Sequence, residues 1–161
     1  EQRVLLIDCD LRRPNIHNIF KLDNKNGLTN VIGKMIEVDE AVRNDVLPNL
    51  DILPAGTIAP NPSELMCSAR FQELYKQFVR DYDYVIFDTP PIGVVADALL
   101  LKDLIAGFVV VVRERSTTHG DLQHLIDSVK LADSTILGLL EVGCTYDSKR
   151  RKKGYYYYQY Y

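Results

Sequence analysis

The sequence predicts an α/β fold in which a mostly parallel sheet carries helices on both faces. Two apolar runs, Val4–Asp8 and Tyr84–Asp88, are unbroken and end in aspartate, as parallel strands buried on both faces commonly do. Strand-like runs alternate with longer segments of helical spacing, which indicates right-handed crossover connections. The 161 residues suffice for one domain, which we assign to residues 1–145, followed by a tail at 146–161.

Periodicity and turn residues place the elements in order. Strands are expected at residues 4–8, 50–54, 84–88, 108–112 and 136–142. Helices are expected at residues 27–35, 38–43, 61–80, 96–105 and 121–132. The run at 108–112 is apolar enough to predict a central strand. The helix at 61–80 has the clearest start, because Asn61 has the features of an N-cap and Pro62 and Glu64 take the first and third helical positions.

Three carboxylates follow the two acidic strands. Asp8 and Asp88 end the runs, and Asp10 lies two residues beyond the first. The carboxyl ends of parallel strands meet at the edge where open α/β sheets bind ligands, so we expect the three to converge there. A cation would relieve their repulsion, and oxygen ligands favour Mg²⁺. The alternative is that each aspartate merely ends a strand or caps the next helix.

Composition excludes some classes of protein. The net charge of -3 argues against a nucleic-acid partner, which usually requires a basic face. Cys9, Cys67 and Cys144 show no pairing or zinc spacing and lie among apolar neighbours, which predicts buried thiols in a reducing compartment. No apolar run approaches eighteen residues and no signal peptide opens the chain, so a soluble, cytosolic protein is expected.

The tail differs sharply from the domain. Five consecutive cations at residues 149–153 precede a tyrosine cluster consisting of Tyr155, Tyr156, Tyr157, Tyr158, Tyr160 and Tyr161. The cluster could be an adhesive aromatic patch or an aggregation-prone β segment, although flanking cations oppose aggregation. We favour a set of phosphate acceptors, because each phosphate would add about -1.5 to -2 charges to a basic tail.

These motifs together resemble the bacterial tyrosine kinases. The run from Leu5 to Arg12 is similar to their Asp-rich nucleotide motif (Walker A′), and the run from Val85 to Pro91 is similar to their Walker B motif. Residues 60–65 resemble their characteristic helix start, and the terminal tyrosines resemble their acceptor cluster. The likeness covers the whole chain and points to the capsule-synthesis kinases of Gram-positive bacteria. It implies a P-loop NTPase-like fold of the MinD/ParA type, use of ATP and Mg²⁺, and autophosphorylation of the tail.

The resemblance also implies roles for single residues. Asp8 would lie nearest the attacking tyrosine hydroxyl, as general base or through metal-bound water, while Asp10 and Asp88 would hold Mg²⁺, Asp88 through water. Arg12 would neutralise phosphate, brace the carboxylates or form a structural ion pair. Arg113 and Thr117, after the strand at 108–112, would lie on the nucleotide edge. Asp97 stands where the family often keeps an aspartate, but a helix cap explains it nearly as well.

The family implies partners as well: the cytoplasmic tail of a membrane polysaccharide co-polymerase as activator, a tyrosine phosphatase, and other copies of the chain. The protein would then associate peripherally with the inner face of the membrane. Among its departures from the family pattern, the chain has no Gly-x-x-x-x-Gly-Lys-[Ser/Thr] loop. We expect the preceding strand, loop and helix, about 30 residues, to be missing, which would leave an inactive fragment. The alternative is a non-catalytic scaffold that presents tyrosines to other kinases and binds a membrane partner.

Overall fold

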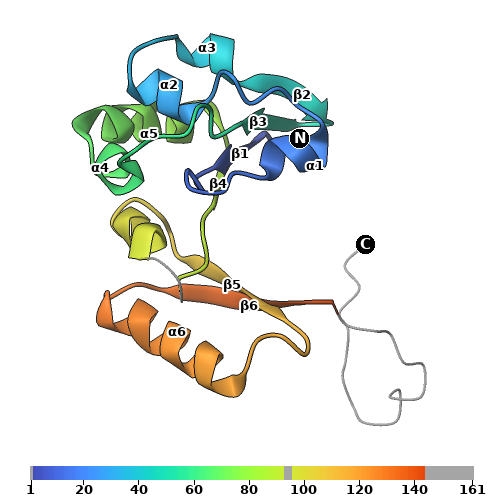
Figure 1. Ribbon diagram of the computed structural model, residues 1–161, viewed down its shortest axis with the longest axis vertical. Helices are drawn as coiled ribbons and strands as arrows, with labels where there is room; N and C mark the ends of the chain where they lie inside the picture. The colour runs from blue at the N-terminus through green and yellow to red at the C-terminus, as the bar shows by residue number, and fades with distance from the viewer. Residues whose placement is uncertain (1, 93–95, 144–161) are drawn as a thin grey trace.

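The computed structural model describes residues 2–92 and 96–143, whose strands form two sheets (Figure 1). The larger sheet has the order β2-β3-β1-β4, and the smaller consists of β5 and β6. The strands are β1 (Val4–Asp8), β2 (Arg43–Leu47), β3 (Leu50–Leu53), β4 (Tyr84–Asp88), β5 (Phe108–Arg113) and β6 (Ile136–Val142). The helices are α1 (Ile16–Phe20), α2 (Leu28–Ile32), α3 (Val38–Ala41), α4 (Pro62–Met66), α5 (Ala69–Asp81), the 3-10 helix η1 (Ala96–Leu101) and α6 (His119–Leu131).

Parallel pairing dominates both sheets. β1 lies between β3 and β4 and pairs in parallel with each, and β5 pairs in parallel with β6. Among the described strands, β2 alone runs antiparallel to its neighbour, β3. The predicted α/β fold with a mostly parallel sheet is therefore confirmed. In the same two ranges of residues, no helix has the length and apolar character needed to cross a bilayer.

β1 supplies the centre of the main core. Leu5 and Ile7 have no exposed surface and lie in one cluster with Phe71, Leu74 and Phe78 of α5. The α5 residues recur at helical spacing and therefore form a single apolar stripe. Because full burial of such a side chain stabilises by roughly 1.5–3 kcal/mol, this packing fixes β1 firmly against α5. The position of Asp8 at the end of β1 follows from it.

The smaller sheet is covered on one face by α6. Phe108 and Val129 are buried there, and the partly buried Leu125 and Ile136 pack against them. The opposite face exposes Val109 by 59% and β4 exposes Ile86 by 51%. The run at 108–112 was expected to be a central strand, but within the described residues β5 pairs with β6 alone. Both β4 and β5 therefore have a sheet edge that no described strand covers.

The helix expected over 61–80 is instead two helices, α4 and α5. The break falls at Cys67 and Ser68, where Ser68 takes an extended conformation with φ -69° and ψ 150°. Its hydroxyl accepts a hydrogen bond from the backbone N–H of Phe71 and donates one to the carbonyl of Leu65. A serine that can cap the second helix and close the first favours this interruption over a continuous helix. Cys67 is exposed at the break, which corrects the expectation of a buried thiol, whereas Cys9 is buried as expected.

Other elements differ in extent. The helix expected at 38–43 ends at Ala41, because Arg43 begins β2 and its guanidinium bonds the carbonyls of Glu40 and Ala41. The helix expected at 96–105 is a 3-10 helix that ends at Leu101. The short elements α1 and β2 were not predicted, since each has only five residues, too few to show a clear period. The strands at 4–8, 84–88 and 136–142 match their predicted bounds.

A buried polar cluster joins the amino end of the larger sheet to α5. Asp51, 4% exposed, accepts hydrogen bonds from the Tyr82 hydroxyl at 2.7 Å, the Arg3 guanidinium at 3.0 Å and the backbone N–H of Asp45 at 2.8 Å. Arg3 also lies over the Tyr82 ring at 4.8 Å. Burial acts to raise the pKa of Asp51, but these donors together lower it below its ordinary value. The cluster therefore stabilises the fold through an ionised carboxylate.

We expect Tyr82→Phe to lower the free energy of unfolding by on the order of 1–2 kcal/mol at neutral pH, because it removes a donor to a buried carboxylate. A lowered carboxyl pKa contributes stability that is present above the ordinary value of 3.8 and is lost as the pH falls through the folded-state pKa. The difference from wild type should therefore shrink below pH 3.8. Urea unfolding at neutral pH and below pH 3.8 measures the difference in the free energy of unfolding, with the exposed Tyr84→Phe as control. An equal loss in both variants would contradict the account.

Candidate active site

The parallel pairing of β1 and β4 brings two of the predicted carboxylates to one edge. The register pairs Asp8 with Asp88 at the carboxyl ends of the two strands. The chain then continues the pairing for one more bond, from the backbone N–H of Cys9 to the carbonyl of Asp88 at 2.8 Å. Asp10 follows directly, and its charge and that of Asp8 both act on Asp88. The sequence-based expectation that the three carboxylates converge agrees with this geometry.

Asp8 is fully buried and holds the loop that follows β1. Its Oδ1 accepts the backbone N–H of Asp10 at 3.2 Å, and its Oδ2 accepts those of Asn15 and Ile16 at 3.1 Å each. The side chain of Asn15, the N-cap of α1, makes no capping bond. Asp8 therefore satisfies the first N–H groups of α1 from the end of β1. Burial raises the pKa of its carboxyl group, against the effect of the three N–H donors.

Asp10 and Asp88 are more open. Asp10 is half-buried, and its Oδ1 accepts the backbone N–H groups of Arg12 at 3.2 Å and Arg13 at 2.9 Å. Asp88 is exposed, and partial desolvation together with the charges of Asp8 and Asp10 raises its pKa. Within residues 2–92 and 96–143, no hydrogen bond reaches Asp10 Oδ2 or either carboxylate oxygen of Asp88. Three oxygens are thus open to a ligand at this edge.

The donor set suits Mg²⁺ bound jointly with water and phosphate. Across the described ranges, no group of three or more His, Cys, Asp or Glu side chains is arranged to hold a metal ion by itself. Mg²⁺ commonly takes one or two carboxylates and completes its shell with water and substrate phosphates. Asp10 and Asp88 meet that requirement. Burial raises the pKa of the Cys9 thiol well above its ordinary value, so the neighbouring sulfur stays protonated.

Arg12 forms the structural ion pair that the sequence left open. Its Nε lies 2.7 Å from Asp97 Oδ2, and its Nη2 donates to Ser63 Oγ at 3.3 Å. Asp97 is therefore the partner of Arg12, and the Arg12 bond and the Ser63 hydroxyl lower the pKa of its carboxyl group despite burial. The sequence alone identifies Ser63 only as part of a helix start. The one available signal was the resemblance of residues 60–65 to a family motif.

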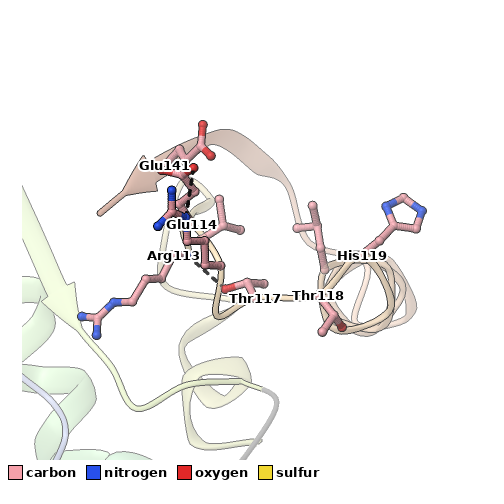
Figure 2. Close-up of a pocket in the computed structure, with 9 residues that line it drawn as sticks. Arg113, Glu114, Thr117, Thr118, His119 and Glu141 are labelled. Atoms are coloured by element: carbon pink, nitrogen blue, oxygen red, sulfur yellow. Dashed lines mark hydrogen bonds and ion pairs between the residues drawn. The ribbon is translucent and has the colours of Figure 1, made fainter. Parts of the chain in front are cut away.

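Arg113 and Thr117 lie at the carboxyl end of β5, in the smaller sheet. They line a pocket of about 220 Å³ with Glu114, Thr118, His119 and Glu141 (Figure 2). Thr117 Oγ1 accepts the backbone N–H of Arg113 at 3.0 Å, so this hydroxyl braces the turn before α6. Thr118 caps α6 reciprocally with Asp121. The residues that line this pocket do not include Asp8, Asp10 or Asp88.

The six terminal tyrosines and Cys144 lie outside the described residues. Their predicted roles stay predictions.

Comparison with known proteins shows which proteins the sequence resembles. A family model described as an AAA domain matches residues 1–140. The chain is 39% identical over 155 residues to the tyrosine-protein kinase YwqD of Bacillus subtilis. The aligned region covers 96% of this chain and 65% of that protein. It is 31% identical over 156 residues to the putative tyrosine-protein kinase CapB of Staphylococcus aureus, covering 97% and 67%. The chain thus spans about two thirds of the length of these relatives.

Solved structures extend the likeness to three dimensions. The kinase domain of the Escherichia coli tyrosine kinase ETK matches with a TM-score of 0.84 at 30% identity, over 99% of this chain and 61% of that one. The septum site-determining protein MinD from Pyrococcus horikoshii, complexed with Mg-ADP, matches with a TM-score of 0.66 at 22% identity, over 86% and 56%. The second match concerns the fold alone. The predicted P-loop NTPase-like fold is confirmed by both.

The different surroundings of the carboxylates predict different effects on stability. Asp8→Asn places an amide NH₂ against backbone donors, so we expect it to lower the free energy of unfolding by about 1–3 kcal/mol in the absence of metal. Asp88→Asn removes a charge that its neighbours repel, so we expect unchanged or higher stability. Thermal unfolding with a chelator present compares the two. Equal destabilisation would show that Asp8 does not hold the loop as described.

Proposed function

Because the chain belongs to the family of bacterial tyrosine-protein kinases, we propose that the complete protein transfers phosphate from ATP to its own terminal tyrosines. The transfer would regulate capsular or exopolysaccharide synthesis. The observation that carries the proposal is the acidic edge, which consists of Asp8, Asp10 and Asp88. The strand register sets Asp8 beside Asp88, and oxygens of Asp10 and Asp88 are left open to a ligand. Phosphoryl transfer depends mainly on alignment and charge neutralisation, which such an edge supplies.

Each residue of the edge has a proposed part. Asp10 and Asp88 would hold Mg²⁺, Asp88 through water, and the ion would neutralise charge on the phosphates. Asp8 has no exposed surface, and its oxygens already accept three N–H groups. We therefore assign it first to holding the loop. A direct role as base toward the tyrosine hydroxyl would require this loop to open when substrate binds. Arg12, paired with Asp97, would support the loop and not bind phosphate.

We place the phosphate loop, which these 161 residues lack, next to the uncovered edges of β4 and β5. β4 ends one sheet and β5 lies in the other, and neither is covered by a described strand on its second edge. Ile86, Val109 and Val111 expose apolar surface on these strands, by 51%, 59% and 56%. A strand that paired with both would join the two sheets, and the loop after it would reach the carboxyl ends beside Asp88. The greater length of the relatives supports such a segment.

The pocket beyond β5 is proposed to contact the nucleotide. Arg113 lines it, at the carboxyl end of a parallel strand, where ligands bind in folds of this class. Thr117 would act through the turn that its hydroxyl braces, and the O–H hydrogen and second lone pair of that hydroxyl would be available to the nucleotide.

The proposed partners follow the family. They are the cytoplasmic tail of a membrane polysaccharide co-polymerase as activator, a tyrosine phosphatase that reverses the reaction, and further copies of the chain. The activator would hold the protein at the inner face of the cell membrane. A second candidate function is a non-catalytic scaffold that presents its tyrosines to other kinases and binds a membrane partner. The burial of Asp8 favours it, because its oxygens already accept three backbone N–H groups and are not free to act as a base.

Variants of the acidic edge test the proposal. In the complete protein, Asp10→Ala or Asp88→Ala should lower Mg²⁺-dependent phosphate transfer roughly 100-fold or more, because each removes a ligand that positions charge at the phosphates. Asp103→Ala, whose side chain is 83% exposed, is the matched control. Transfer of radiolabelled phosphate from ATP measures the effect. Wild-type turnover in either edge variant would refute the site, and no transfer by the wild-type protein would favour the scaffold.

A separate prediction concerns the phosphate loop. The 161 residues alone should bind ATP–Mg²⁺ weakly and should not phosphorylate themselves, because backbone N–H groups and a lysine that cradle phosphates are lacking. Extension by the upstream segment should restore binding. Isothermal calorimetry on both forms decides the matter. Tight binding by the 161-residue form would show that the loop is dispensable.

A further inference from the structure

A polar network beside the acidic edge joins three segments that are distant in sequence. The Arg12 guanidinium grips Asp97 with two bonds, from Nε to Oδ2 at 2.7 Å and from Nη2 to Oδ1 at 3.4 Å. The Ser63 hydroxyl donates to the same Oδ1 at 2.8 Å. Asp97 is only 8% exposed, so its charge is compensated almost wholly by these two residues. The loop after β1, the start of α4 and η1 are thereby fastened together.

The backbone of Arg12 contacts a proposed metal ligand. While its side chain bonds Asp97, its N–H donates to Asp10 Oδ1 at 3.2 Å, and the N–H of Arg13 donates to the same oxygen at 2.9 Å. Fixing the guanidinium therefore restricts the peptide groups that orient the Asp10 carboxylate. One oxygen is committed to the backbone, which leaves Oδ2 for a ligand.

We propose that Asp97 and Ser63 are positioning residues that act through Arg12 to hold the Asp10 carboxylate in place for a divalent cation. The catalytic consequence rests on the proposed function, whereas the ordering of the loop does not. A ligand must be held within a fraction of an ångström by neighbours that are themselves fixed, and a bidentate guanidinium–carboxylate pair provides such fixation. Releasing Arg12 to a phosphate would leave the buried Asp97 with Ser63 alone, so the network also keeps Arg12 away from the nucleotide.

The first measurement is amide hydrogen exchange over residues 10–16 of the complete protein. Asp97→Asn keeps the shape of the side chain but loses its charge and one acceptor, so exchange at Arg12 and Arg13 should accelerate on the order of tenfold. The helix α5 should keep its protection. Asp81→Asn, in the exposed Arg80–Asp81 pair, is the control and should leave the loop unchanged. Ser63→Ala, a milder variant, should accelerate exchange less and serves if Asp97→Asn does not fold.

The second measurement is the binding of Mn²⁺, as a probe for Mg²⁺, by electron paramagnetic resonance with a non-hydrolysable ATP analogue present. Asp97→Asn should weaken Mn²⁺ binding about 10- to 100-fold, the usual effect of removing support from a metal ligand. Arg12→Lys should do the same because lysine cannot make the fork, and the double variant should be no worse than either single one.

The two measurements separate the inference from the function it rests on. Unchanged exchange at Arg12 and Arg13 in both Asp97→Asn and Ser63→Ala would overturn the inference even in an active kinase. Additive losses of Mn²⁺ affinity in the double variant would overturn the route through Arg12. Faster loop exchange in a protein that transfers no phosphate would support the positioning role and refute the proposed function.

Discussion

The parallel pairing of β1 with β4 is the interaction on which the rest of the structure depends. It is fixed from one side by the burial of Leu5 and Ile7 against α5, and its register sets Asp8 level with Asp88. Each residue of β1 from Val4 to Asp8 has a partner on β4 from Tyr84 to Asp88, so the two aspartates emerge at the same end of the sheet. The acidic edge is thus a consequence of core packing, because the residues that bury β1 also determine where its carboxylates emerge.

The carboxylates at this edge have separate tasks because their surroundings differ. Asp8 is buried under three backbone N–H groups and fastens the loop, whereas Asp10 and Asp88 keep oxygens open and raise the local negative potential. The proposed site, which would receive a cation with its phosphates, would need both kinds of carboxylate. The ion pair between Arg12 and Asp97 acts together with Asp8. It orders the loop, and its guanidinium bonds Asp97 and leaves the open oxygens of Asp10 and Asp88 uncontacted.

The sequence predicted what depends on long apolar periods and missed what depends on single contacts. The runs ending in Asp8 and Asp88 revealed two strands and the acidic edge, because unbroken apolar runs that end in aspartate are typical of parallel strands. The expected burial on both faces does not hold for β4, whose Ile86 is 51% exposed. The short α1 was missed because its capping group, Asp8, lies eight residues before Ile16. The break at Ser68 depends on one hydroxyl, and the partner of Arg12 lies 85 residues away. The open edges of β4 and β5 could not be predicted from composition, which shows apolar strands but not their neighbours.

The most direct test of the account is to map where phosphate is attached. The complete protein, as wild type and as Asp88→Asn, would be incubated with ATP and Mg²⁺ and its C-terminal peptide analysed by mass spectrometry. The account predicts phosphate on tyrosines between Tyr155 and Tyr161 in the wild-type protein and almost none in the variant. An unmodified tail in the wild-type protein, or a tail modified equally in both, would contradict it.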